Sequence, residues 1–192
     1  MLRPWRDEDI EAWVDLCADE RVMEFFPSTV DRAESTSTAL RLRERLERNG
    51  YGWWVLERRS EPGFIGAIAL QEVPFEAAFT PALEIGWRLS VAAWGRGYAT
   101  EGARAALNFA FEQLECDEVV AMTSTLNVRS RRVMERLGMR RDPRDDFENP
   151  GIEMGHRLRP HVLYRATGRG RNRCERALAV KWQGSRRGVG TL

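Results

Sequence analysis

The chain has 192 residues, of which 43% are apolar and 31% are charged, and its formal net charge at pH 7 is +1. These values are typical of one soluble globular domain with enough chain for a single hydrophobic core. No apolar run approaches the ~20 residues of a membrane-spanning helix, and the first residues show no signal-peptide pattern. We therefore expect neither a membrane-bound nor a secreted protein.

The three cysteines, Cys17, Cys116 and Cys174, are odd in number and widely spaced, with no Cys-x-x-Cys pair. This pattern predicts no disulfide bond and no zinc site, and it favours a location in the reducing cytoplasm.

Charge is unevenly distributed along the chain. Residues 168–192 carry a net charge of +6, so residues 1–167 carry −5. We interpret 1–167 as the folded domain and 168–192 as a basic, disordered C-terminal tail. The mildly acidic body favours a cationic acceptor such as an amine. We expect no contact with nucleic acid from the folded domain, and we favour a tail without function over one that contacts RNA.

The first half of the chain alternates helical and extended patterns. Residues 2–5 form a short extended start, 9–19 and 31–48 have helical patterns, and an apolar loop at 22–27 lies between them. Two near-continuous apolar runs, 53–56 and 64–70, are typical of central strands in a hairpin. The second half adds strands at 83–90, 118–124 and 161–165. The helix between the first two of these makes them a parallel pair in an otherwise antiparallel sheet.

A glycine turn follows the strand at 83–90. Gly95 and Gly97 lie in this turn, and the helix after it has small or apolar residues at i, i+3, i+4 and i+7 from Ala99 to Leu114. The N–H groups at a helix start have no partner inside the helix, and the helix dipole is positive there. The turn therefore predicts a site for a diphosphate.

Two common nucleotide motifs are excluded at this turn. A P-loop requires a Lys and a Ser or Thr after its last glycine, whereas Ala103 and Arg104 follow Gly102. A dinucleotide fingerprint requires a third glycine at the position of Thr100.

A second motif covers residues 127–139. Asn127 is a plausible N-cap, a helix follows it, and Gly138 ends that helix before Met139. Ser130 lies in the first turn of this helix, and Met134 lies one turn later on the same face.

Together the two motifs resemble those that hold acetyl-CoA in the GNAT acetyltransferases. The family pattern Gln/Arg-x-x-Gly-x-Gly/Ala falls on residues 94–99, with Trp94 in place of Gln or Arg, and Asn-x-x-Ser followed by Glu-Arg-Leu-Gly-Met falls on 127–139. Trp94, together with Glu84-Ile85-Gly86 ahead of it, is similar to the RimJ/RimL-type branch of the family. The resemblance covers about residues 2–166.

The resemblance implies an α/β fold: a GNAT-like, mixed, mostly antiparallel twisted sheet with helices on both faces. It also implies a parallel strand pair that splays after residues 87–89, where the pantetheine arm of acetyl-CoA enters. The resemblance further implies acetyl-CoA as the co-substrate and no need for a metal. The residues that the resemblance places at this co-substrate are Trp87, Arg88, Leu89, Trp94, Gly95, Arg96, Gly97, Tyr98, Ala99, Thr100, Asn127 and Ser130.

The implied reaction is transfer of an acetyl group to a primary amine, either a protein N-terminus or a small molecule. The two N-terminal helices of the family flank the acceptor cleft, so Phe25 and Phe26 either line that cleft or pack in the core. Glu84 is the best candidate for the general base, and a strand-end charge or a structural partner is the alternative, because the sequence does not show which face of the strand looks into the cleft. Many family members have a tyrosine as general acid where Met134 stands, which leaves Ser130 as the polar group near the sulfur.

Two other function classes remain open on the sequence. One is a non-catalytic acyl-CoA-binding sensor, which the missing tyrosine suggests, and the other is an RNA-associated module that acts through the tail. The sequence leaves open the acceptor amine and the choice between a monomer and a homodimer.

Overall fold

A computed structural model of the chain describes residues 1–168. Its elements in chain order are β1 (Leu2–Arg3), α1 (Asp9–Ala18), α2 (Arg32–Asn49), β2 (Trp53–Glu57), β3 (Phe64–Glu72), β4 (Leu83–Leu89), a 3-10 turn (Val91–Ala93), α3 (Tyr98–Glu112), β5 (Glu118–Ser124), α4 (Val128–Arg136), β6 (Arg140–Arg141), a second 3-10 turn (Pro143–Asp145), β7 (Phe147–Glu148) and β8 (Pro160–Thr167). The predicted basic tail and the boundary that precedes it lie outside, or at the limit of, the described residues.

The eight strands form one sheet in the order β1-β2-β3-β4-β5-β8-β6, and β7 also pairs with β8. Every neighbouring pair is antiparallel except β4 and β5, which are parallel. The strand–helix–strand pattern at 83–124 predicted this parallel pair. The short strands β6 and β7 were not predicted, because two residues are too few to show an alternating pattern.

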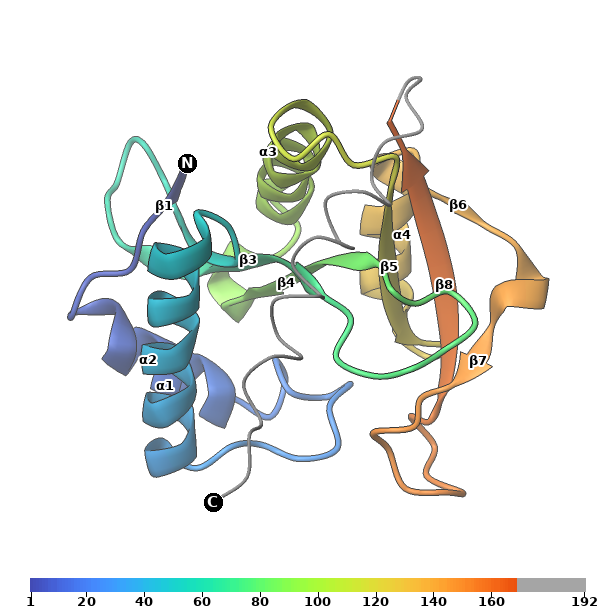
Figure 1. Ribbon diagram of the computed structural model, residues 1–192. Coiled ribbons are helices and arrows are strands. Elements are labelled where there is room, and N and C mark those ends of the chain that lie inside the picture. The colour runs from blue at the N-terminus through green and yellow to red at the C-terminus, as the bar shows by residue number, and fades with distance from the viewer. Residues whose placement is uncertain (169–192) are drawn as a thin grey trace, which may run out of the picture.

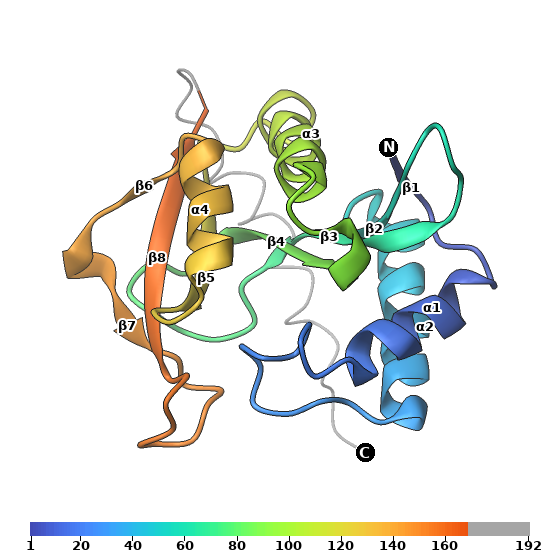
Figure 2. The same ribbon diagram turned by 180° about the vertical axis from the view of Figure 1, so that it is seen from behind.

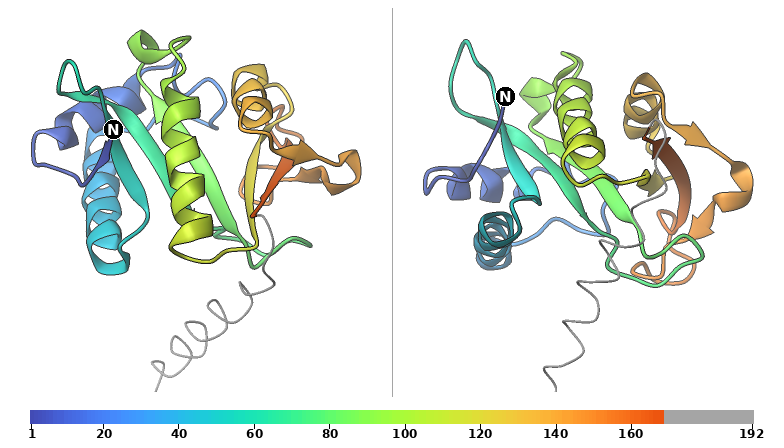
Figure 3. Two further views of the ribbon diagram at one scale, coloured as in Figure 1. Left: turned by 90° about the horizontal axis from the view of Figure 1, so that it is seen from above. Right: turned by 45° about the horizontal axis from the view of Figure 1, so that its top comes forward.

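Helices cover both faces of the sheet (Figures 1 and 2). On one face, α1 and α2 enclose a core that includes Trp13, Ala39 and Ala67. On the other face, α3 lies across β3 and β4, and its core includes Ile68 and Ala106 (Figure 3). The mixed α/β fold with helices on both faces is therefore confirmed.

Gly102 allows α3 to lie close to the sheet. A Cβ atom at this position would be only 2.9 Å from Cγ1 of Ile68, so a side chain there would push the helix away from β3. The close approach fixes the N-terminus of α3 beside the end of β4.

The sheet opens between β4 and β5. Their parallel pairing covers only Leu83 with Val119 and Glu84 with Val120. Beyond Glu84, β4 stays paired with β3 as far as Leu89, whereas β5 stays paired with β8. The two halves of the sheet therefore diverge from Glu84 onward, earlier than the residues 87–89 at which the sequence places the splay.

Candidate functional site

The two faces of strand β4 look toward different helices. Ile85 and Leu89 belong to the core under α3, and Trp87 packs against the same core. Because successive strand residues point to opposite faces, Glu84 and Arg88 point to the face covered by α1. Trp87 therefore packs its side chain beneath α3, while the side chains of Glu84 and Arg88 face the side of α1.

The turn between β4 and α3 has the conformation that a diphosphate site needs. Gly95 and Gly97 have left-handed φ angles of 71° and 82°, which only glycine adopts without strain. Gly97 caps α3 without any side-chain hydrogen bond, whereas Asp31 caps α2 and Asn127 caps α4 through their side chains. The N–H groups of the first turn of α3 are thus left for a ligand.

A hollow of about 760 Å³ lies over this turn and the first turns of α3. It is lined by Gly95, Arg96, Gly97, Thr100, Glu101, Arg104, Ala105, Asn108 and Arg136. Three arginines against one glutamate make the hollow electropositive, as the phosphates of CoA would require. The hydroxyl of Thr100 is buried without a hydrogen-bond partner, so one further polar atom here lacks a partner within the protein.

The sequence analysis did not include Arg104 and Arg136 among the residues at the co-substrate, although both line the hollow. The signal for Arg104 was present, because it lies four residues after Thr100 and so on the same face of the helix. Arg136 comes from α4, and only the packing of the two helices brings it near: Nη2 of Arg104 donates to the carbonyl oxygen of Arg136 at 3.0 Å.

Trp94 replaces the Gln or Arg of the family pattern and joins the two sides of the splay. Its indole N–H donates to the carbonyl oxygen of Leu89 at 2.9 Å. Its ring lies 4.4 Å from Cζ of Arg129, at the start of α4, and Arg129 forms an ion pair with Glu24 in the loop after α1. These contacts link that loop, the β4–α3 turn and α4 around the opening.

Asn127 is the N-cap of α4, as predicted. Its Oδ1 accepts from the backbone N–H of Ser130 at 3.1 Å, and its Nδ2 donates to the hydroxyls of Ser130 and Thr123. The Ser130 hydroxyl thus accepts one hydrogen bond and keeps its own proton to donate. Met134, only 2% exposed, packs in the core beneath α4.

Glu84 lies at the apex of the splay, at the last paired position of β4 and β5. Burial raises the pKa of its carboxyl group from an ordinary 4.5 to about 7, and a hydrogen bond from Gln71 opposes this rise. Gln71 lies opposite Glu84 on β3 and accepts at Oε1 from the Trp53 indole at 2.8 Å. This chain of contacts fixes the position of a carboxyl group that titrates near neutral pH.

Phe25 and Phe26 lie in the loop after α1 and contact arginines. The ring of Phe26 is 4.3 Å from Cζ of Arg88, and the ring of Phe25 is 5.6 Å from Cζ of Arg129. Phe26 is 38% exposed. The prediction that these rings line the acceptor cleft is therefore compatible with their positions, whereas packing in the core is wrong for Phe26.

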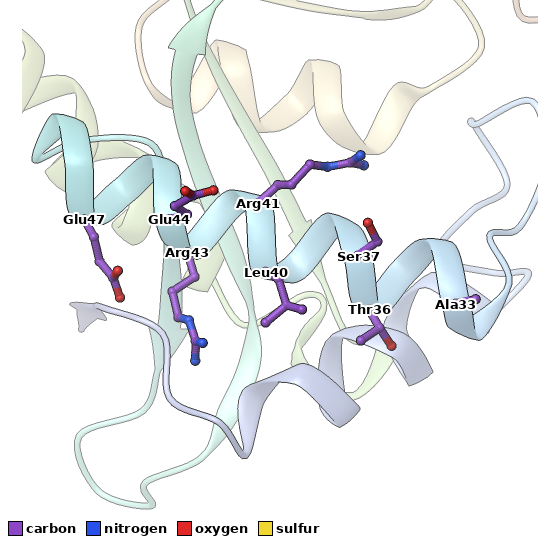
Figure 4. Close-up of a pocket in the computed structure, with 8 residues that line it drawn as sticks. All are labelled: Ala33, Thr36, Ser37, Leu40, Arg41, Arg43, Glu44 and Glu47. Carbon is purple, nitrogen blue, oxygen red and sulfur yellow. The ribbon is translucent and has the colours of Figure 1, made fainter.

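A second hollow, of about 550 Å³, lies on the outer side of α2 and is drawn in Figure 4. Short polar side chains and the salt-bridge formers Arg43 and Glu44 line it, far along the chain from both motifs. We assign it no part in the chemistry.

Within residues 1–168, no helix is long and apolar enough to cross a bilayer. The same residues contain no group of three or more His, Cys, Asp or Glu side chains placed to hold a metal ion.

Comparison with known proteins identifies relatives of this fold. Residues 1–140 match the family model described as "Acetyltransferase (GNAT) domain". The chain is 35% identical over 166 residues to an FsC-acetyl coenzyme A-N(2)-transacetylase of Aspergillus fumigatus. The alignment covers 80% of this chain and 69% of that protein.

Solved structures of acetyltransferases share the fold. A GNAT-family acetyltransferase from Bacillus anthracis superposes with a TM-score of 0.71 at 23% identity, over 86% of this chain and 93% of the other. A spermidine N-acetyltransferase from Vibrio cholerae, in complex with CoA and spermine, superposes with a TM-score of 0.69 at 15% identity, over 87% and 94% of the two chains.

Proposed function

The chain belongs to the GNAT family of acetyl-CoA-dependent N-acetyltransferases, and from this premise we propose that it transfers the acetyl group to a primary amine held on the α1 side of β4. The acceptor is either a protein N-terminus or a small-molecule amine. The observation that carries the proposal is the placement of Glu84 at the apex of the splay, with the uncapped N-terminus of α3 at its open end.

Acetyl-CoA would be held mainly by backbone and by arginine. The N–H groups of residues 95–100 and the side chains of Arg96, Arg104 and Arg136 would bind its phosphates, since free N–H groups and guanidinium groups both favour phosphate oxygens. The ends of β4 and α4, at residues 87–89 and 127–130, would flank the pantetheine arm. Trp87 contributes through its backbone, because its side chain packs under α3.

Acetyl-CoA supplies the activated acetyl group, and the protein prepares the amine. An α-amine has a pKa of about 7.7–8.0 and a lysine amine about 10.4, so each must lose a proton before it attacks. We propose Glu84 as the general base, because a carboxyl pKa of about 7 leaves it ionised for a useful fraction of molecules at neutral pH while it remains a stronger base than an exposed glutamate.

We propose that Ser130 donates a hydrogen bond to the departing sulfur, directly or through a water. Its hydroxyl is oriented by Asn127 and retains its own proton for donation. Met134 takes no part in this step, because it is buried in the core. We assign the chain to the RimJ/RimL-type branch on the strength of Trp94 and the absence of the tyrosine.

An acceptor panel tests the proposal. Thiol release from acetyl-CoA is measured with peptides that carry free N-termini, with diamines and with amino acids, for the wild type and for Gly97→Asp. We expect amine-dependent release from the wild type and loss of this release in the variant, because an aspartate would place negative charge at the phosphates. If no amine accelerates release from the wild type, the proposed function is wrong.

A further inference from the structure

Arg88 is a cation on the acceptor side of β4 for which residues 1–168 provide no carboxylate within ion-pair distance. Its Nη1 donates to the sulfur of Cys17 at 3.1 Å, and a sulfur is a weak acceptor. Its Nε is buried without any partner. A guanidinium has five N–H donors, so most of its hydrogen-bonding capacity is unused.

Aromatic rings enclose the guanidinium of Arg88 on two sides. Its Cζ lies 4.3 Å from the ring of Phe26 and 4.9 Å from the ring of Trp13. These contacts hold the charge in place but supply no hydrogen-bond acceptor. The indole N–H of Trp13 is also buried without a partner. This corner of the protein therefore has an excess of donors over acceptors.

Such a group is costly to keep without a partner. Burial lowers the pKa of Arg88 from its usual value, since removal of a cation from water disfavours the charged form. An anionic ligand would bring both the missing charge and the missing acceptors, and a carboxylate matches the guanidinium in a bidentate arrangement. Phe26, which contacts this guanidinium, is 38% exposed, so a ligand would reach Arg88 past this ring.

We infer that Arg88 binds a carboxylate of the acceptor, so that the substrate class is an amine that also carries a carboxylate. The inference rests on the proposed function and specifies its substrate. Trp13 and Phe26 position the guanidinium, and polyamines without an anionic group are disfavoured because their remaining ammonium group would face the Arg88 cation.

The strand sets the distance between the two ends of this substrate. Glu84 and Arg88 are four residues apart on the same face of β4, which places their Cα atoms roughly 13 Å apart at about 3.3 Å per residue. The amine at Glu84 and the carboxylate at Arg88 are therefore separated by several bonds. A diamino acid acetylated on its distal amine fits this spacing, as does a short peptide acetylated at its N-terminus.

Matched acceptors test the inference directly. Lysine and cadaverine carry the same distal amine but differ in the carboxylate, and a tripeptide and its C-terminal amide differ in the same way. We expect kcat/KM to be at least about tenfold higher for the carboxylate member of at least one pair, as the loss of a charged hydrogen bond implies. Arg88→Met should abolish the preference, and Arg88→Lys should retain part of it.

The readouts separate the inference from the function on which it rests. If the wild type acetylates cadaverine as well as lysine and also acetylates the peptide amide as well as the free peptide, or if Arg88→Met keeps the preference, the carboxylate site is wrong although the enzyme is an amine acetyltransferase. If acetyl-CoA raises the melting temperature but no amine in the panel releases thiol, the proposed function fails. Binding of N-acetyllysine and N-acetylcadaverine in the presence of CoA then decides the inference: preferential binding of the acid supports it, and equal or absent binding overturns it.

Protein stability provides an independent check. A partly buried cation without an ionic partner loses hydration that no opposite charge replaces, so its replacement by an apolar side chain of similar length should be neutral or stabilising. Arg88→Met should therefore be at least as stable as the wild type in urea. A marked loss of stability would show that Arg88 is a structural residue, and this too would overturn the inference.

Discussion

Replacement of Glu84 by glutamine tests the most consequential electrostatic feature of the site. Glu84→Gln keeps the shape of the side chain and its contact with Gln71, but it removes the ionisable group. In the wild type, burial raises the carboxyl pKa from 4.5 to about 7, so the folded protein binds a proton more tightly than the unfolded chain. Stability therefore falls as pH rises from the unfolded to the folded pKa and changes little above that.

The magnitude follows from the two pKa values. At about 1.4 kcal/mol per pKa unit, the gap between 4.5 and 7 corresponds to an upper limit of roughly 3–4 kcal/mol. The free energy of unfolding of Glu84→Gln, minus that of the wild type, should increase by most of this amount between about pH 5 and pH 8. The subtraction cancels the titration of the other carboxyl groups.

Urea unfolding at a series of pH values measures this difference. Glu72→Gln is the matched control, because Glu72 is an exposed carboxylate on the neighbouring strand β3. In parallel, kcat/KM for the best acceptor should rise with pH through about 7 in the wild type and should lose this limb in Glu84→Gln. If the stability difference is the same at every pH, the carboxyl group is well solvated and the case for Glu84 as the base is lost.

Three further predictions concern cofactor binding, turnover and the fold. Gly97→Asp should abolish the rise in melting temperature that acetyl-CoA produces. Gly155→Asp, the control with the same φ of 82° in open space, should keep this rise, and equal stabilisation of both variants would contradict the diphosphate assignment. Ser130→Ala should lower kcat by about 10- to 100-fold with unchanged acetyl-CoA affinity, and Thr123→Val, which removes the other acceptor of Asn127 Nδ2, should not; a change in affinity alone would make Ser130 a binding residue. Asp9→Ala should reduce the free energy of unfolding by about 3 kcal/mol in urea titrations, because it leaves the buried Arg3 with only Glu57 as an ionic partner. A loss below about 1 kcal/mol would show that water replaces the carboxylate.

The sequence predicted the elements that have clear periodicity. The apolar pattern of α3, with Gly102 on its inner face, predicted both the helix and its packing on the sheet, and Asp31 and Asn127 predicted helix starts that the structure reproduces. These features are local, so a single chain shows them.

Features that depend on contacts between distant segments were not predictable. The strand β4 carries bulky residues on both faces, so its pattern could not show that Arg88 points toward α1 and Trp87 toward α3. Likewise, the start of the splay depends on which neighbour each strand keeps, and no residue in β4 or β5 marks Glu84 as the last paired position. The contact of Arg129 with Trp94 joins two motifs through tertiary packing alone.

A crystal structure of the protein with bound CoA is the most direct test of the account. We predict that the diphosphate lies within hydrogen-bonding distance of the backbone N–H groups of residues 95–100, that Arg104 and Arg136 lie beside the phosphates, and that the thiol points between Glu84 and Ser130. A diphosphate bound elsewhere would contradict the proposed site. So would a thiol that neither the Glu84 side chain nor the Ser130 side chain can reach.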